Sequence, residues 1–367
     1  MVEDVNKIFG RDFVIAFFVP SLAFLFVTIA YLHVSGRPIS WLKINPDDPL
    51  KGSTFIALVT LTASFCLMSV NRLVIRTLEG YWIFDLGRSI RFIQTARFRW
   101  LQSRIETLTK EAIRCKEQKI TFTKRRKRNR LMLRAAQRFP SREDQILCTS
   151  FGNTFKAFED YPRVMYGFES IQGWSRLNTI LPKEFRETLS STRSLTDFWA
   201  NIWFLSLVFI AQYIVVEILF LGHTSDVRIL LKAFPDAWFL YSAIVVAFVS
   251  SWQARIAAAQ WGEWVKAAFD VFLPELCTKL GYKRPLDIKA EREFWTKVSQ
   301  AIVYRDPVSL EELTDLREAA SDRTSKKGSN YDKQVTEKDS SKRRGFGDNL
   351  VRVARLLTWS LIFRRQK

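Results

Sequence analysis

Four long apolar blocks dominate the pattern of hydrophobic and polar positions along the chain. They cover Phe13–Val34, Thr54–Ile75, Phe198–Leu221 and Ala237–Ala258, and each is 22 to 24 residues long. A helix rises about 1.5 Å per residue, so each block can cross a hydrocarbon core about 30 Å thick. Backbone polar groups inside lipid must pair within their own segment, which favours helices. The pattern predicts an all-α integral membrane protein with four transmembrane helices arranged as two hairpins.

The residues between the second and third blocks predict a helical cytoplasmic module. Within residues 77–140, apolar side chains recur at helical spacing, and Lys124–Arg128 is a run of five cations. We expect a long basic helical hairpin there, with the cationic run at or near its tip. Residues 141–197 are rich in aromatic and turn residues. They predict a compact helical subdomain whose last helix continues into the third block.

The remaining segments complete the predicted organisation. Residues 1–76 hold the first transmembrane hairpin, residues 198–258 hold the second, and residues 259–304 continue as cytoplasmic helices. Residues 305–345 are largely polar or charged and cannot bury enough apolar surface to offset ordering, so we expect a largely disordered linker. In residues 346–367, apolar residues are interspersed with arginines, which is typical of a basic amphipathic helix at a membrane surface.

Charge predicts the orientation of the spans. The chain of 367 residues carries 56 Lys+Arg against 37 Asp+Glu, a formal net charge of +19. Only five cations lie in the two short loops, 35–53 and 222–236, whereas residues 77–197 carry 24. Short loops rich in Lys and Arg stay in the cytoplasm. We therefore predict a multi-pass protein whose two termini and helical module face the cytoplasm.

The aromatic string Thr149–Pro162 carries a resemblance to known proteins. Together with Tyr166-Gly167 and Trp174–Leu177, it resembles a group of uncharacterised bacterial four-span membrane proteins, and Ala268–Trp295 is similar to the same group. The resemblance implies an integral protein of the bacterial cytoplasmic (inner) membrane, and it implies no activity. The basic hairpin and the C-terminal tail lie outside the matching part.

Catalytic and metal-binding motifs are missing from the sequence. It contains two histidines, His33 and His223, and no metalloprotease, serine-hydrolase, P-loop or dinucleotide-binding string. The four cysteines have no C-x-x-C spacing, so they indicate neither a disulfide framework nor a zinc site. We predict no catalytic residue, no bound metal and no cofactor, although a site made only of carboxylates would leave no such motif.

Polar residues within the apolar blocks form the first candidate site. Glu217, Gln212, Asn201 and Asn71 would line an intramembrane polar path if they face one shared cavity. Pairing of Glu217 with a cation of a neighbouring loop is the structural alternative. For Arg255, at the inner end of the fourth block, we expect either pairing with Asp197 or extension toward anionic lipid.

Two further candidates lie outside the apolar blocks. Asn153, Glu159 and Asp160 are either a cytoplasmic ligand pocket or a capped helix end whose carboxylates pair with nearby arginines. The second candidate is a set of cations that would contact anionic lipid headgroups, an acidic protein or nucleic acid, or that merely form a solvated surface. These cations are Lys124, Arg125, Arg126, Lys127, Arg128, Arg352 and Arg355.

The sequence favours a non-enzymatic membrane protein with a cytoplasmic sensing or scaffolding module. Its expected partners are a bilayer with anionic headgroups and a second copy of the chain, together with a cytoplasmic protein or a nucleic acid at the basic hairpin. The alternative is an oligomeric ion channel or pore-forming effector. The third hypothesis is a membrane enzyme that uses the carboxylate pair Glu159 and Asp160.

Overall fold

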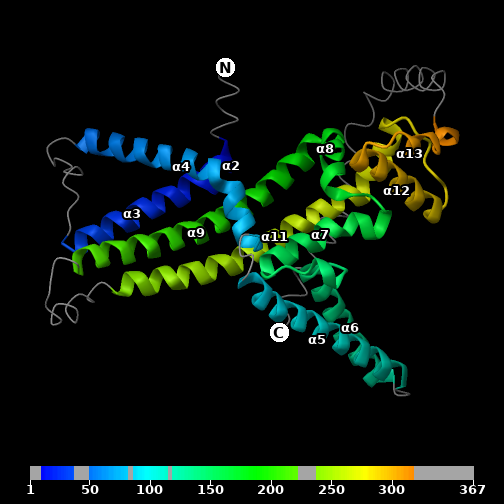
Figure 1. Cartoon of the computed structure of the whole chain (residues 1–367), viewed down its shortest axis with the longest axis horizontal. Coiled ribbons are helices and arrows are strands. Elements are labelled where there is room, and N and C mark those ends of the chain that lie inside the picture. Colours follow the sequence, from blue (N-terminus) through cyan, green and yellow to red (C-terminus); the bar gives the residue numbers. More distant parts are fainter. Residues whose placement is uncertain (1–9, 37–48, 82–85, 115–117, 222–236, 318–367) are drawn as a thin grey trace.

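The protein is an all-α membrane protein. The computed structural model describes residues 10–36, 49–81, 86–114, 118–221 and 237–317. Within these ranges the regular elements are helices, and the single bridge between Tyr282 and Arg317 extends into no strand. Four helices are long and apolar enough to cross a membrane, which confirms the prediction. They lie side by side at one end of the molecule, and the shorter helices gather at the other end (Figure 1).

The first membrane hairpin begins with one continuous span made of α2 (Arg11–Phe13), the π-helical turn η1 (Val14–Phe18) and α3 (Val19–Val34). The π-helical turn comes just before Pro20, which has no N–H and therefore interrupts the regular bonding pattern. The return helix, α4 (Pro49–Glu79), extends beyond its apolar block by one turn.

The second membrane hairpin continues far outside its apolar blocks. It consists of α9 (Lys183–Leu221) and α11 (Ala237–Lys279), which pack against each other more extensively than any other pair of described helices. Small buried side chains on α11 allow this close approach. They include Ala243, Ala247, Ser250, Ala254 and Ala258. Because both helices are uninterrupted, each one continues from its apolar block into the group of helices beyond the membrane part.

The other helices form a helical body around the C-terminal half of α11. It contains α7 (Ser150–Tyr166), α8 (Ser170–Ile180), α12 (Ile288–Tyr304) and the short α13 (Val308–Glu311). A single 3-10 turn, η3 (Glu143–Gln145), precedes α7, and another, η4 (Thr314–Leu316), follows α13. Aromatic side chains supply much of the buried core. The most deeply buried of them include Phe168, Phe269, Phe294 and Trp295.

An arm of two helices, α5 (Leu86–Arg114) and α6 (Gln118–Arg138), projects from the body (Figure 1). Leu101 and Leu108, which belong to the apolar positions at helical spacing, are buried, and so is Phe98. The arm covers most of the residues, 77–140, for which a basic helical hairpin was expected. The cationic run Lys124–Arg128 lies in the N-terminal half of α6, inside regular helix.

Several predictions fall on residues 318–367, which lie outside the described residues. They concern most of the expected linker, the amphipathic C-terminal helix, and the proposed contacts of Arg352 and Arg355.

Candidate functional site

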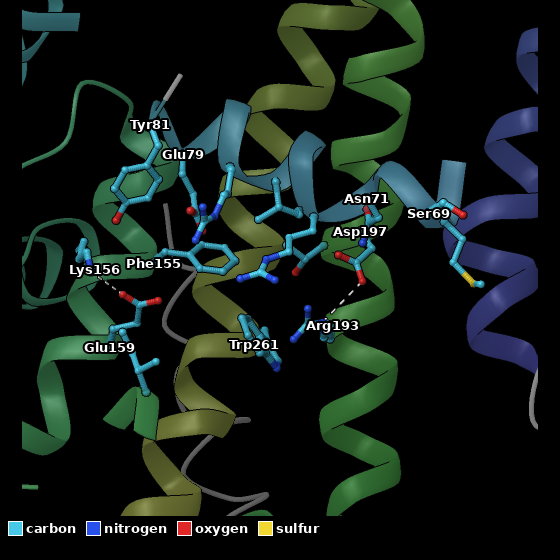
Figure 2. Close-up of a pocket in the computed structure, with 16 residues that line it drawn as sticks. Ser69, Asn71, Glu79, Tyr81, Phe155, Lys156, Glu159, Arg193, Asp197 and Trp261 are labelled. Atoms are coloured by element: carbon cyan, nitrogen blue, oxygen red, sulfur yellow. Dashed lines mark hydrogen bonds and ion pairs between the residues drawn. The ribbon is translucent and has the colours of Figure 1, made fainter. Parts of the chain in front are cut away.

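A cavity of about 840 Å³ lies where α4, α7, α9 and α11 meet, at the end of the apolar blocks (Figure 2). We call it the junction cavity. Met68, Ile75, Phe155, Ile171 and Trp261 give it an apolar wall. The charged side chains that line it are Arg72, Arg76, Glu79, Lys156, Glu159, Arg193 and Asp197. The lining is therefore amphipathic, with aromatic and aliphatic surface between charged groups.

Local sequence fixes the end of α4 at this cavity. Gly80 adopts φ 94°, and the N–H groups of Gly80 and Tyr81 both donate to the carbonyl of Arg76, so the helix stops there. Thr149 caps α7 by accepting from the N–H of Gly152 at 2.9 Å, and its hydroxyl also donates to the Glu79 carbonyl at 2.9 Å. One threonine thus joins the end of α4 to the start of α7.

The first charged group of the cavity surrounds Glu79, four residues beyond the apolar block of α4. Lys156 Nζ lies 2.9 Å from Glu159 Oε2, and the Tyr81 hydroxyl interacts with the same lysine. Burial of Glu79, followed by the neighbouring Glu159 carboxylate, raises the pKa of Glu79 from 4.5 to about 7. Lys156 and Arg76 act in the opposite direction but do not cancel this effect. Glu79 is therefore a carboxylate that changes charge near neutral pH.

The raised pKa of Glu79 predicts a pH-dependent stability. The folded protein holds the Glu79 proton more tightly than the unfolded chain, so the stabilisation is complete below about pH 4.5 and is lost as the pH rises through 7. We expect Glu79→Gln to raise the unfolding free energy at pH 8 by on the order of 2 kcal/mol relative to wild type, with little difference at pH 4.5. Thermal unfolding in detergent across this pH range measures the effect.

Glu184→Gln provides the control, because Glu184 is exposed in the first turn of α9. It should leave the slope of stability against pH close to that of wild type. Parallel pH profiles for wild type and Glu79→Gln would contradict the role assigned to Glu79.

The second charged group lies between α4 and α9. Arg193 Nε is 3.7 Å from Asp197 Oδ2, and the guanidinium stacks 5.1 Å from the centre of the Trp261 ring. The Asn71 side chain also hydrogen-bonds Asp197. Asp197 therefore pairs with Arg193 and Asn71, and within the described residues it forms no ion pair with Arg255, contrary to one of the two expectations. Part of the Arg193 charge remains available to the cavity because a 3.7 Å contact is long for an ion pair.

Arg72 and Arg76 occupy two successive turns of α4 and point into the same cavity. Within the described residues, no carboxylate oxygen lies within 4 Å of either guanidinium. The cavity thus contains four cations and three carboxylates, and two of the cations have no direct ion-pair partner. No group of three or more His, Cys, Asp and Glu that could hold a metal was found among the described residues. The chemistry favoured by this lining is binding of an anion that carries an apolar part.

Asn201 of α9 contacts the first membrane hairpin instead of lining the cavity. Its side chain is fully buried and donates from Nδ2 to the carbonyl of Ala16 at 2.8 Å. That carbonyl lies four residues before Pro20, which has no N–H to offer it. Asn201 therefore satisfies a backbone acceptor that would otherwise be left unpaired inside the membrane, where such a group is costly.

The other residues of the predicted polar path also do not share one cavity. Glu217 Oε1 accepts a hydrogen bond from the Tyr31 hydroxyl at 2.9 Å, within an aromatic cluster at the opposite end of α9. Gln212 is partly exposed on α9, and Asn71 lines the junction cavity. Of the four residues proposed for a shared path, only Asn71 lies at this cavity, and the loop cations suggested as partners of Glu217 lie outside the described residues.

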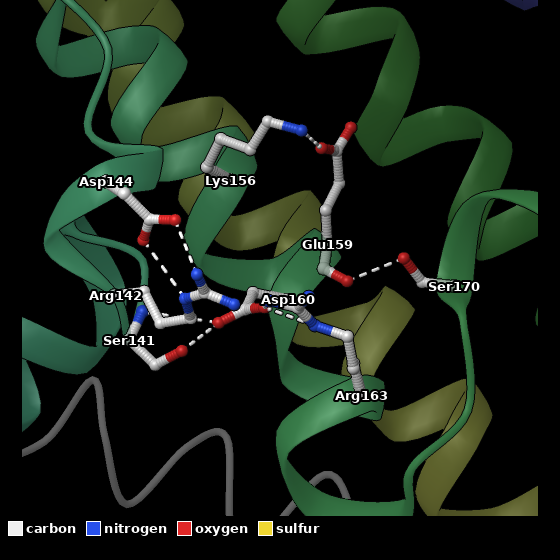
Figure 3. A network of polar contacts seen from close by, with 8 residues as sticks. All are labelled: Ser141, Arg142, Asp144, Lys156, Glu159, Asp160, Arg163 and Ser170. Carbon is white, nitrogen blue, oxygen red and sulfur yellow. Dashed lines mark hydrogen bonds and ion pairs between the residues drawn. The ribbon is translucent and has the colours of Figure 1, made fainter. Parts of the chain in front are cut away.

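Asn153, Glu159 and Asp160 form no shared pocket and make separate structural contacts. Figure 3 shows those of Glu159 and Asp160. Asn153 is fully buried and bonds both the N–H and the carbonyl of Leu147, at 2.7 and 3.0 Å. Asp160 is buried, pairs with Arg163 at 2.5 Å and accepts from the Ser141 hydroxyl. Glu159 alone of the three lines the junction cavity. Asp160 therefore follows the alternative expectation, in which the carboxylates pair with nearby arginines.

Most residues of the junction cavity were not predicted from the sequence. Arg72 with Arg76, and Arg193 with Asp197, have i,i+4 spacing, which places each pair on one helix face. That spacing was the available signal, but it does not reveal that the two faces meet. A second missed feature joins α7 to α11, because Asp270 Oδ1 accepts from the hydroxyls of Tyr161 and Tyr166, at 2.9 and 2.7 Å.

Comparisons of the chain with models of known protein families, with curated proteins and with solved structures found no significant match. The function is therefore inferred from the geometry of the site.

Proposed function

We propose that the protein is a membrane-anchored sensor or scaffold in which the junction cavity binds an amphipathic anion. The observation that carries this proposal is the cavity of about 840 Å³, with its apolar wall and two arginines that lack a carboxylate partner within the described residues. A volume in this range suits a small ligand or a single-chain amphiphile. Arginine is well suited to phosphate and carboxylate groups because its planar fork donates two parallel hydrogen bonds.

The position of the cavity supports a sensing role. Its walls come from the end of α4, from α7 in the body, and from α9 and α11, which run uninterrupted from membrane to body. A ligand between these helices would contact the membrane part and the helical body at the same time. Such a ligand would bind most tightly to the relative position of α4 and α7 that gives it the best contacts. A difference in affinity between two such positions is what allows a ligand to drive a conformational change.

A matched pair of probes tests the proposed ligand class. We expect the full chain, purified in a nonionic detergent, to bind dodecyl phosphate and to bind dodecylphosphocholine weakly. The two probes share one chain, but the second carries a compensating positive charge. In Arg72→Gln/Arg76→Gln, dodecyl phosphate affinity should fall at least about tenfold, because each charge-assisted hydrogen bond contributes about 1.5–3 kcal/mol. Native mass spectrometry measures the bound fraction.

Arg125→Gln/Lys127→Gln removes the same charge from exposed positions of α6 and serves as the control. It should change dodecyl phosphate affinity less than twofold. Equal losses in both double variants would show that binding follows net charge and would contradict a defined site. Equal binding of the two probes by wild type would contradict an anionic ligand.

A further inference from the structure

Arginines from three helices gather where the arm joins the body. Arg97 belongs to α5, and Arg134 and Arg138 are one turn apart on α6. The rings of Phe98 and Phe139 are 5.5 Å apart, so the residues next to them, Arg97 and Arg138, lie at the same level of the arm. Arg255 of α11 is within electrostatic reach of Arg97 and Arg138. We call these four residues the arginine cluster.

The arginine cluster differs from Arg99 of α5, which pairs with Glu143 at 2.5 Å. Arg91 of α5 donates to the Asp144 backbone carbonyl at 2.7 Å. Within the described residues, none of the four clustered arginines forms an ion pair. Helix α6 itself contains nine cations and no carboxylate.

Unbalanced charge of this kind destabilises the fold unless an anion is present. Burial lowers the pKa of Arg138, and the like charges of Arg134 and Arg97 lower it further. An anion between the guanidinium groups would replace this repulsion with charge-assisted hydrogen bonds.

The depth of the arginine cluster indicates where that anion comes from. Arg255 lies in the last turn of the apolar block Ala237–Ala258, and Trp252, one turn earlier, is 53% exposed. Exposed tryptophan and arginine near the end of a span are typical of the headgroup layer. These features fit a position of Arg255 in the headgroup layer, whereas α5 and α6 extend away from the spans (Figure 1).

We propose that Arg97, Arg134, Arg138 and Arg255 form a binding site for the phosphate of an anionic phospholipid headgroup. The lipid would join the base of the arm to the fourth span, and it would set the angle at which the arm leaves the membrane. This site is separate from the junction cavity, because none of its four residues lines that cavity. It assigns a lipid contact to the base of the arm and leaves Lys124–Arg128 outside it.

Lipid binding by the full chain tests this proposal. In a nonionic detergent, we expect native mass spectrometry to detect retained phosphatidylglycerol in preference to phosphatidylcholine, and we expect phosphatidylglycerol to raise the unfolding temperature. Arg134→Gln/Arg138→Gln should lower phosphatidylglycerol affinity at least about tenfold. It should also abolish the lipid-dependent rise in unfolding temperature. Because the substitutions remove like-charge repulsion, the variant should unfold at the wild-type temperature or higher without lipid.

The control removes two cations from the same helix at a distance from the arginine cluster. Arg125→Gln/Lys127→Gln should change phosphatidylglycerol affinity less than twofold, and Arg255→Gln should reduce it as a single substitution in a different helix. Equal losses in the two α6 double variants would overturn the site in favour of diffuse attraction. A stabilisation by inorganic phosphate equal to that by phosphatidylglycerol would overturn the lipid as its source.

Discussion

Gly152→Ala is expected to lower the free energy of unfolding by about 3 kcal/mol, at the upper end of the usual range for overpacking. A Cβ atom at this position would lie 2.2 Å from the Glu79 carbonyl oxygen and 2.9 Å from Leu147 Cδ1. The first contact is with backbone that is already held by the Thr149 hydroxyl, so it cannot move aside cheaply. Alanine gains about 1 kcal/mol of helix propensity over glycine, which offsets only part of this loss.

Thermal unfolding in detergent measures this loss, and Gly36→Ala separates the steric clash from the general effect of adding a methyl group. Gly36 has φ 64° and no atom within 4 Å of the added Cβ, so only the left-handed backbone penalty of about 1 kcal/mol applies. A Gly152→Ala protein no less stable than Gly36→Ala would show that α4 and α7 are not closely packed at this point. Because the clash would displace Glu79, we also expect Gly152→Ala to weaken dodecyl phosphate binding.

The membrane part of the fold could be predicted from the sequence because lipid imposes a simple condition on it. A block such as Thr54–Ile75 has one stable backbone arrangement in hydrocarbon, so its length and its composition are sufficient. The continuation of α9 and α11 into the body was also predictable, because no Pro or Gly cluster interrupts the helical pattern at the ends of the spans. The arm followed from the apolar stripe through Leu101 and Leu108.

The candidate site could not be predicted in the same way, because it depends on contacts between helices that are far apart in sequence. Arg72 and Arg193 line one cavity although 120 residues separate them, and no local pattern encodes that meeting. Polar residues in spans were misleading for a related reason. Asn201 looked like part of a path, but its partner is a carbonyl of another helix that Pro20 leaves unpaired. A sequence read one segment at a time identifies polar residues, but it does not distinguish those that bind a ligand from those that satisfy backbone.

Trp295→Ala is expected to lower the free energy of unfolding of the helical body by about 3–5 kcal/mol, because it removes a large buried side chain and leaves a cavity. Trp295 is 1% exposed, and its ring lies 4.9 Å from the rings of both Phe168 and Phe294. Phe168 in turn contacts Phe269 of α11, with ring centroids 6.0 Å apart. Trp295 thus joins α12, through Phe168, to the helix that continues into the membrane, and α12 should separate first.

Limited proteolysis distinguishes this local loss from general unfolding. In Trp295→Ala, new cleavage should occur around α12 at temperatures where the circular dichroism signal of the spans is still intact, because apolar helices keep their internal backbone hydrogen bonds in a detergent micelle. Tyr304→Ala removes an aromatic side chain that is 75% exposed at the end of the same helix, and it should change stability by less than about 0.5 kcal/mol. If Trp295→Ala lost the helical signal of spans and body together, the body and the membrane part would be one cooperative unit.

In one cooperative unit, a ligand bound between α4 and α7 would stabilise the whole chain. Separate unfolding of the body would confine the stabilising effect of the ligand to the junction cavity.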